Sequence, residues 1–198
     1  MEDSSLAGQI EKDLSLFSGL SLGFAGCAPE LYVLIRAVRP RTVVETGVAN
    51  GVSSAYILQA IRRNETGSLV SISLPSERDP LIPAGKTLGW VVPQELRDNW
   101  ELCLGKSSDL LPRLLKLKGS VDICFHDSDH SFENMTFELE KFRSHVSPGG
   151  YIVCDDVWRN GAFQEFCQRY YLHPSYLRNA GIARAVYSST PIASVGLE

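Results

Sequence analysis

The chain has few of the features that mark membrane, secreted or nucleic-acid-binding proteins. Its longest apolar runs, such as Leu31–Ile35 and Tyr151–Cys154, are far shorter than the roughly 18 residues of a membrane-spanning helix. No apolar run follows a basic start and precedes a cleavage site. With 19 Lys and Arg against 23 Asp and Glu, the net charge is -4, whereas nucleic acid demands clustered basic side chains. We therefore expect no membrane, no secretion and no nucleic acid.

Cysteine is also scarce and unpatterned. The five cysteines lie at positions 27, 103, 124, 154 and 167, and no two have the two-residue spacing of zinc or redox motifs. Cys124 and Cys154 fall inside apolar runs, where cysteine behaves as a small hydrophobic residue. The pattern favours reduced structural thiols and a cytoplasmic protein.

What the chain does contain is an alternation of β-rich runs with helical patterns. Its 198 residues are 44% hydrophobic, which suits one globular core. Alternating strands and helices predict an α/β fold, with a mostly parallel sheet and helices on both faces. We expect a single domain over residues 1–198, with N-terminal helices within residues 1–40. The predicted strands are 42–46, 68–73, 102–105, 121–126, 151–154 and 182–187, and the helices that follow the N-terminal one are 28–38, 52–63, 109–117, 132–145 and 162–170.

Two connections stand out. Residues 75–99 hold four prolines and two glycines and are too long for an ordinary connection in a compact domain, so we expect a lid or substrate loop. The Ser-Pro-Gly-Gly segment at Ser147–Gly150 predicts a turn that ends a helix and leads into a strand.

The first candidate site lies where strand 42–46 ends. Glu45, Gly47 and Gly51 form an E-x-G-x-x-x-G pattern that leads straight into a helix. This is not the G-x-G-x-x-G pattern of dinucleotide sites, and an acid here would repel a pyrophosphate. The pattern favours a ligand with a cationic amino acid part. The alternative is that the glycines only let the helix pack against the strand.

Acidic residues follow two further predicted strands. Asp127 comes after strand 121–126, and Asp155 and Asp156 come after strand 151–154. The carboxyl ends of neighbouring strands converge on the ligand crevice of such sheets, so these carboxylates should lie close together. Their repulsion could be relieved by a divalent cation or by a raised proton affinity.

The segment after Asp127 carries further polar residues. Asp129 and Ser131 are expected to cap the helix that begins near Phe132. His130 could reach the same site as a base or ligand, or could be a solvated turn residue.

Four segments together carry a resemblance to a known family. They are ETGVANGVS at Glu45–Ser53, GWVVPQEL at Gly89–Leu96, FHDSDHSFENM at Phe125–Met135 and SPGGYIVCDDV at Ser147–Val157. Over roughly residues 28–190 the chain resembles class I S-adenosylmethionine-dependent methyltransferases, in particular a small-molecule group with an HDS-x-HS-[YF]-ENM segment. The resemblance implies a Rossmann-like fold, a seven-stranded sheet with a reversed last strand, and methyl transfer to a hydroxyl of a small molecule.

The resemblance also implies roles for individual residues. The implied donor-binding residues are Glu45, Gly47, Gly51, Ser53, Ser73 and Asp127. Ser73 departs from the pattern, because the family usually has an acid there for the ribose hydroxyls, and Glu77 is an alternative acceptor.

The implied catalytic residues are His130, as the base, and Asp127. The implied ligands of a divalent metal are Asp127, Asp155 and Asp156.

The mechanism that we expect follows from these roles. A metal, most plausibly Mg²⁺, would lower the pKa of the acceptor hydroxyl while His130 removes its proton. The alternatives are a metal-free N- or O-methyltransferase and a non-catalytic protein that binds S-adenosylmethionine or a nucleoside. Trp90, Trp100 and Trp158 fit an acceptor pocket and a packed core equally well. The sequence does not identify the small molecule that accepts the methyl group, and it is compatible with a homo-oligomer.

Overall fold

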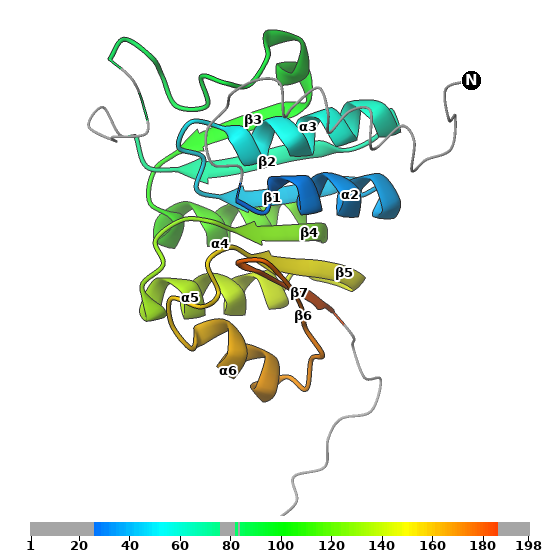
Figure 1. Ribbon diagram of the computed structural model, residues 1–198, viewed down its shortest axis with the longest axis vertical. Coiled ribbons are helices and arrows are strands. Elements are labelled where there is room, and N and C mark those ends of the chain that lie inside the picture. Colours follow the sequence, from blue (N-terminus) through cyan, green and yellow to red (C-terminus); the bar gives the residue numbers. More distant parts are fainter. Residues whose placement is uncertain (1–25, 76–81, 83, 186–198) are drawn as a thin grey trace, which may run out of the picture.

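A single seven-stranded sheet with helices on both faces organises the protein (Figure 1). The computed structural model describes residues 26–75, 82 and 84–185. The strands are β1 (Thr42–Thr46), β2 (Ser68–Ser73), β3 (Trp100–Leu104), β4 (Val121–His126), β5 (Val146–Cys154), β6 (Ser175–Leu177) and β7 (Ala180–Arg184). The helices are α2 (Ala28–Val38), α3 (Val52–Asn64), α4 (Ser107–Lys118), α5 (Phe132–Arg143) and α6 (Ala162–Arg169), with a 3-10 helix η1 (Gln94–Asn99).

The strand order decides where a ligand can bind. The order across the sheet is β3-β2-β1-β4-β5-β7-β6. The first five strands in this order run parallel, β7 is antiparallel to β5, and β6 is antiparallel to β7. The carboxyl ends of β1, β2, β4 and β5 therefore meet at one edge of the sheet, where the order reverses beside β1. The predicted fold class, including the reversed last strand, is confirmed.

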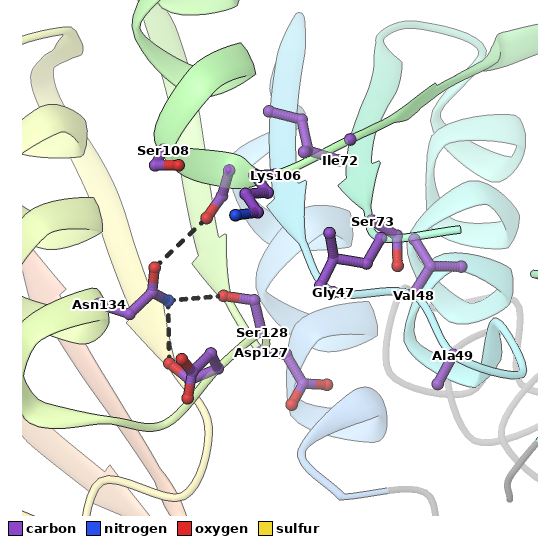
Figure 2. A pocket seen from close by; sticks show the side chains of 14 residues that line it. Gly47, Val48, Ala49, Ile72, Ser73, Lys106, Ser108, Asp127, Ser128 and Asn134 are labelled. Atoms are coloured by element: carbon purple, nitrogen blue, oxygen red, sulfur yellow. Dashed lines mark hydrogen bonds between the residues drawn. The ribbon is translucent and has the colours of Figure 1, made fainter. Parts of the chain in front are cut away.

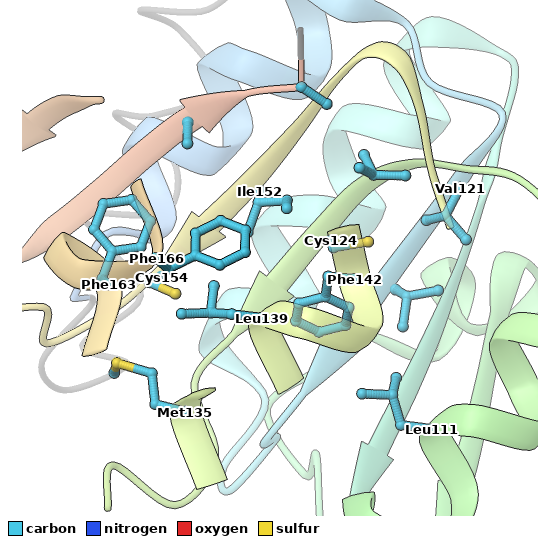
Figure 3. Packing of buried hydrophobic residues seen from close by; sticks show 14 of the residues in the cluster. Leu111, Val121, Cys124, Met135, Leu139, Phe142, Ile152, Cys154, Phe163 and Phe166 are labelled. Carbon is cyan, nitrogen blue, oxygen red and sulfur yellow. The ribbon is translucent and has the colours of Figure 1, made fainter. Parts of the chain in front are cut away.

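Each face of the sheet carries its own hydrophobic cluster. Successive side chains of a strand point to opposite faces, so Val43 packs with α2 and α3 whereas Val44 packs with α4 and α5. Ile152 and Val153 of β5 divide in the same way. Figure 3 shows the second cluster, where Phe142 of α5 lies over the sheet. Because both faces are covered, these strands read as nearly continuous apolar runs.

Most predicted elements agree with the structure, and the deviations have local causes. Helix α2 and strands β1, β2 and β4 have the predicted bounds. Strand β5 begins at Val146 and includes the Ser147–Gly150 segment, which was expected to be a turn. A side chain at Gly150 would lie 2.5 Å from the backbone oxygen of Asp122, so glycine lets the strand continue through an irregular register. Strand β6 was not predicted, because its three side chains are all exposed and show no alternation.

Part of the predicted loop 75–99 is fixed to the fold. The amide of Gly89 donates to the oxygen of Ala49 at 2.9 Å, and the amide of Val91 donates to that of Asn50 at 3.1 Å. A Cβ at Gly51 would lie 2.7 Å from Cα of Gly89, so glycine at 51 allows this contact. The portion around Gly89 and Val91 therefore lies against the turn that precedes α3.

Several expectations fall outside the described residues. These are the first N-terminal helix and Glu77. Within the described part, all five cysteines are free and four are buried. No helix among the described residues is both long and apolar enough to span a bilayer.

Candidate active site

Two pockets open at the carboxyl edge of the sheet, on either side of the turn that follows β1. The β2 pocket, of about 520 Å³, lies toward β2 and β3 (Figure 2). It is lined by Gly47, Val48, Ala49, Ile72, Ser73, Leu74, Gly105, Lys106, Ser107, Ser108, Asp127, Ser128, Asp129 and Asn134. The β5 pocket, of about 510 Å³, is lined by Gly26, Cys27, Ala28, Gly47, Val48, Ala49, Asn50, Val52, Ser53, Phe125, Asp127, His130, Asp155, Asp156 and Arg159. The two share the turn 47–49 and Asp127.

Gly47 brings the ends of β1 and β4 together. Its φ is +87°, and a Cβ there would lie 1.9 Å from the backbone oxygen of Asp127. Any other residue would collide with backbone, which cannot move aside as a flexible side chain can. The motif predicted that glycine would allow a close approach of the backbone, and the group that approaches Gly47 is the backbone of Asp127. Gly47 also lines both pockets, whereas Gly51 lines neither.

Glu45 lies beneath the site and lines neither pocket. Its buried carboxylate accepts hydrogen bonds of 2.6 Å from the hydroxyls of Ser53, Ser54 and Ser71. Burial raises the pKa of Glu45, although these hydrogen bonds oppose the shift. The acid expected to meet a donor instead ties β1 to β2 and to the start of α3. Ser53 donates its hydroxyl to Glu45 and also lines the β5 pocket.

Asp127 is the carboxylate that faces both pockets. Its side chain is 34% exposed, and its backbone amide donates to the oxygen of Thr46 at 2.8 Å. Burial, followed by the negative charges of Asp155, Glu45 and Asp156, raises the pKa of Asp127 well above its ordinary value. A cation entering either pocket at this point would reverse that shift, because an opposite charge stabilises the carboxylate.

His130 lines the β5 pocket and has a ring nitrogen without a hydrogen-bond partner. Its side chain is 16% exposed, and Nε2 is buried without a hydrogen-bond partner, at 3.9 Å from Oδ1 of Asp127. Burial and then the positive charge of His126 lower the pKa of His130, and Asp156 and Asp155 partly oppose this. A neutral imidazole with an open nitrogen can accept a proton at neutral pH. The alternative of a solvated turn residue is wrong, since the ring is mostly buried.

Helix capping fixes the loop that carries Asp127 and His130. The hydroxyl of Ser131 accepts a hydrogen bond from the backbone amide of Asn134 and caps α5, as predicted. Asp129 does not cap the helix directly but accepts a hydrogen bond from the amide of Ser131 at 2.9 Å. The side-chain amide of Asn134 donates to the backbone oxygen of Asp129 at 2.9 Å and to Oγ of Ser128 at 3.1 Å (Figure 2). These bonds hold the loop in one conformation against the start of α5.

A buried carboxylate that sequence reasoning missed supports this loop from below. Glu138 of α5 accepts hydrogen bonds from Nδ1 of His126 at 2.7 Å, the hydroxyl of Ser128 at 2.8 Å and the hydroxyl of Thr46. Glu138 and His126 are both fully buried. The signal was present, because Glu138 lies on the apolar stripe of α5 three residues after Met135.

The three carboxylates expected to hold a metal all line the β5 pocket, but they are not arranged to hold an ion. Asp156 has a φ of +49°, and its carboxylate accepts from Nε of Arg159 at 2.6 Å and from Nδ2 of Asn179 at 3.4 Å. Asp155 accepts from the thiol of Cys27. Across the described ranges, no three Asp, Glu, His or Cys side chains are arranged to hold a metal ion. A hard divalent ion requires oxygen ligands in a defined geometry, and these side chains do not provide that geometry.

The tryptophans line neither pocket. Nε1 of Trp100 donates to Oγ of Ser71 at 2.9 Å, and the Trp100 ring covers Gly89. Trp158 is exposed and stacks on Tyr176 at 5.0 Å between ring centroids. The interpretation of these rings as the wall of an acceptor pocket therefore does not apply to either of the two pockets.

Known proteins resemble this chain in sequence and in fold. Residues 44–157 match the family described as Methyltransferase domain. Two Mycobacterium proteins, from strains KMS and MCS, are each 29% identical over 77% of this chain and are provisionally named as O-methyltransferases. The match covers 64% of each relative, so this chain spans less than two thirds of their length.

Solved structures agree in fold. An O-methyltransferase from Bacillus cereus in complex with SAH (S-adenosylhomocysteine) has a TM-score of 0.64 at 17% identity, with 90% of each chain covered. An SAH-bound methyltransferase from Podospora anserina has a TM-score of 0.60 at 14% identity, covering 82% of this chain and 78% of its own. At such identities the likeness shows the fold. The family match spans more than half of the chain and includes the turn, the loop and the acidic pair, and so this protein belongs to the methyltransferase domain family.

Proposed function

We propose that this protein transfers a methyl group from S-adenosylmethionine to a hydroxyl of a small molecule, without a metal ion. The observation that carries the proposal is Asp127, a carboxylate shared by two pockets, beside a histidine with a free ring nitrogen. The names of the Mycobacterium relatives and the SAH complexes of the structural neighbours support the donor and the reaction type.

In this proposal the donor spans the two pockets. Its adenosine occupies the β2 pocket, where the hydroxyl of Ser73 can form a hydrogen bond with the ribose. Its ammonium group binds Asp127, whose charge is otherwise opposed by its carboxylate neighbours. The sulfonium methyl then points into the β5 pocket, where His130 lies.

The transfer step requires only groups that the β5 pocket holds. The acceptor oxygen attacks the methyl carbon, the carbon–sulfur bond breaks, and its electron pair remains on sulfur as a neutral thioether. Nε2 of His130 takes the hydroxyl proton. Holding acceptor and methyl group in line supplies most of the acceleration.

Titration calorimetry of the full chain with S-adenosylmethionine tests the donor site. We expect wild type to bind and Asp127→Asn to bind about 10- to 100-fold more weakly, because a charged hydrogen bond is lost. Without ligand, Asp127→Asn should melt at a higher temperature than wild type, since it removes repulsion from Asp155. Asp98→Asn, an exposed change outside both pockets, is the control. A wild type that does not bind the donor would refute the proposal.

Ser73→Asp tests the missing ribose acid. Ser73 lines the β2 pocket, and a carboxylate there can accept both ribose hydroxyls. We expect donor affinity to rise by about 1 to 3 kcal/mol in the same calorimetric assay. An unchanged affinity would mean that the ribose lies out of reach of this position. Weak donor binding that Ser73→Asp improves, with no turnover in either protein, would favour the alternative of a non-catalytic binding protein.

A further inference from the structure

The β5 pocket contains a buried carboxylate with an open position. Asp155 is 9% exposed, and its Oδ1 is buried without a hydrogen-bond partner. The carboxylate accepts the thiol of Cys27 and the backbone amide of Asp156, which are neutral donors. Burial and then the charge of Asp156 raise the pKa of Asp155. A buried charge of this kind is costly unless a cation reaches it.

The protein supplies no such cation from the described pocket wall. Arg159 is the one described lining residue with a permanent positive charge, and its Nε lies 2.6 Å from the carboxylate of Asp156. His130 lies beside Asp127, at 3.9 Å, and its pKa is lowered. Two carboxylates, Asp127 and Asp155, therefore face the same cavity without a cationic partner.

The residues around Asp155 indicate which kind of cation could bind there. Among the described residues, no three Asp, Glu, His or Cys side chains are arranged to hold a metal ion. An organic ammonium group needs only a few hydrogen-bond acceptors around its N–H bonds, and it tolerates an open, partly apolar wall. Gly26, Cys27 and Ala28 line the β5 pocket beside Asp155, and a Cβ at Gly26 would lie 3.4 Å from Oδ2 of Asp155.

Each of the two carboxylates, Asp127 and Asp155, can pair with one positive group. Asp127 lines both pockets and is assigned above to the ammonium of the donor. Asp155 lines the β5 pocket and not the β2 pocket, so its partner belongs to whatever shares that pocket with His130. We infer that the methyl acceptor is a small cationic hydroxy compound, bound by its ammonium group at Asp155 with its hydroxyl toward His130. This inference rests on the proposed function.

Binding of matched probes tests the inference. In the presence of S-adenosylhomocysteine, tyramine is compared with 4-propylphenol, and ethanolamine with 1-propanol, so that each pair differs by an ammonium in place of a methyl group. We expect at least one ammonium probe to bind wild type tenfold or more tightly than its neutral partner. Asp155→Asn, and Asp155→Ser as a second variant, should abolish that preference and keep the affinity for S-adenosylhomocysteine. Asp98→Asn should behave as wild type.

Each contrary result has a distinct meaning. Equal binding within both pairs, or a preference that survives in both Asp155 variants, would overturn the inference and leave the donor site intact. A rise in melting temperature with magnesium that Asp155→Asn abolishes would replace the ammonium with a metal. Failure of S-adenosylhomocysteine to bind at all would overturn the proposed function, and with it the assignment of this cation to an acceptor.

Discussion

Replacing His130 by glutamine is expected to lower the turnover number about 100- to 10,000-fold, the range lost with a general base. Glutamine keeps much of the shape of the ring but cannot accept a proton. Donor affinity should remain within a few-fold of wild type, because His130 lines the β5 pocket and not the β2 pocket. The measurement is single-turnover methyl transfer at saturating S-adenosylmethionine, with calorimetry for the donor.

The pH dependence gives this prediction a second readout. Because the pKa of His130 is lowered, the neutral base is present at pH 7 and is lost only as the pH falls below its ordinary value of about 6.5. Wild-type turnover should therefore fall in acid, and this limb should be missing from His130→Gln. His173→Gln, an exposed histidine outside both pockets, is the matched control. Turnover within threefold of wild type in His130→Gln would show that the proton leaves by another route.

Replacing Glu138 by alanine is expected to cost about 3 to 5 kcal/mol of unfolding free energy, as for other broken buried ion pairs. The change leaves the buried imidazole of His126 without its partner and the hydroxyls of Thr46 and Ser128 without their acceptor. Urea denaturation of both proteins measures the loss. Glu133→Ala, an exposed change in the first turn of the same helix, should cost no more than about 1 kcal/mol.

Acid should remove most of this difference. Burial alone raises the pKa of Glu138, but the hydrogen bond and positive charge of His126 outweigh it, and the pKa lies below its ordinary value. A carboxylate of this kind stabilises the fold above its unfolded pKa of about 4.3, and the stabilisation is lost as pH falls through the folded value. The stabilities of wild type and Glu138→Ala should thus converge below pH 4. A constant difference down to pH 3 would mean that the loss comes from packing.

The convergence of the site could be predicted from the sequence, because it depends on topology. Once parallel strands end at Thr46, His126 and Cys154, the covalent order of the chain places those ends at one edge of one sheet. Helix α5 could also be predicted from the sequence, because Ser131 marks its start and the apolar spacing marks its buried face.

Pairing among buried polar side chains was decided only by the tertiary structure. Glu45 was expected to meet a ligand but is held by three serines, one of them from another strand. Asp156 was expected to bind a metal with Asp127 and Asp155, but its backbone has a positive φ and its carboxylate pairs with Arg159. Glu138 was not noticed at all.

The physical reason is the range of the forces involved. Hydrophobic periodicity and turn chemistry act over a few residues, so by themselves they determined the strands, the helices and the edge where the strands end. A carboxylate forms hydrogen bonds only with donors within about 3 Å. Which donors lie that close depends on how separate elements pack. The partners of Glu45 and Glu138 lie up to 26 and 92 residues away in sequence. Only the packed fold brings them together, and it places Asp127, His130 and Asp155 among the residues that line the β5 pocket.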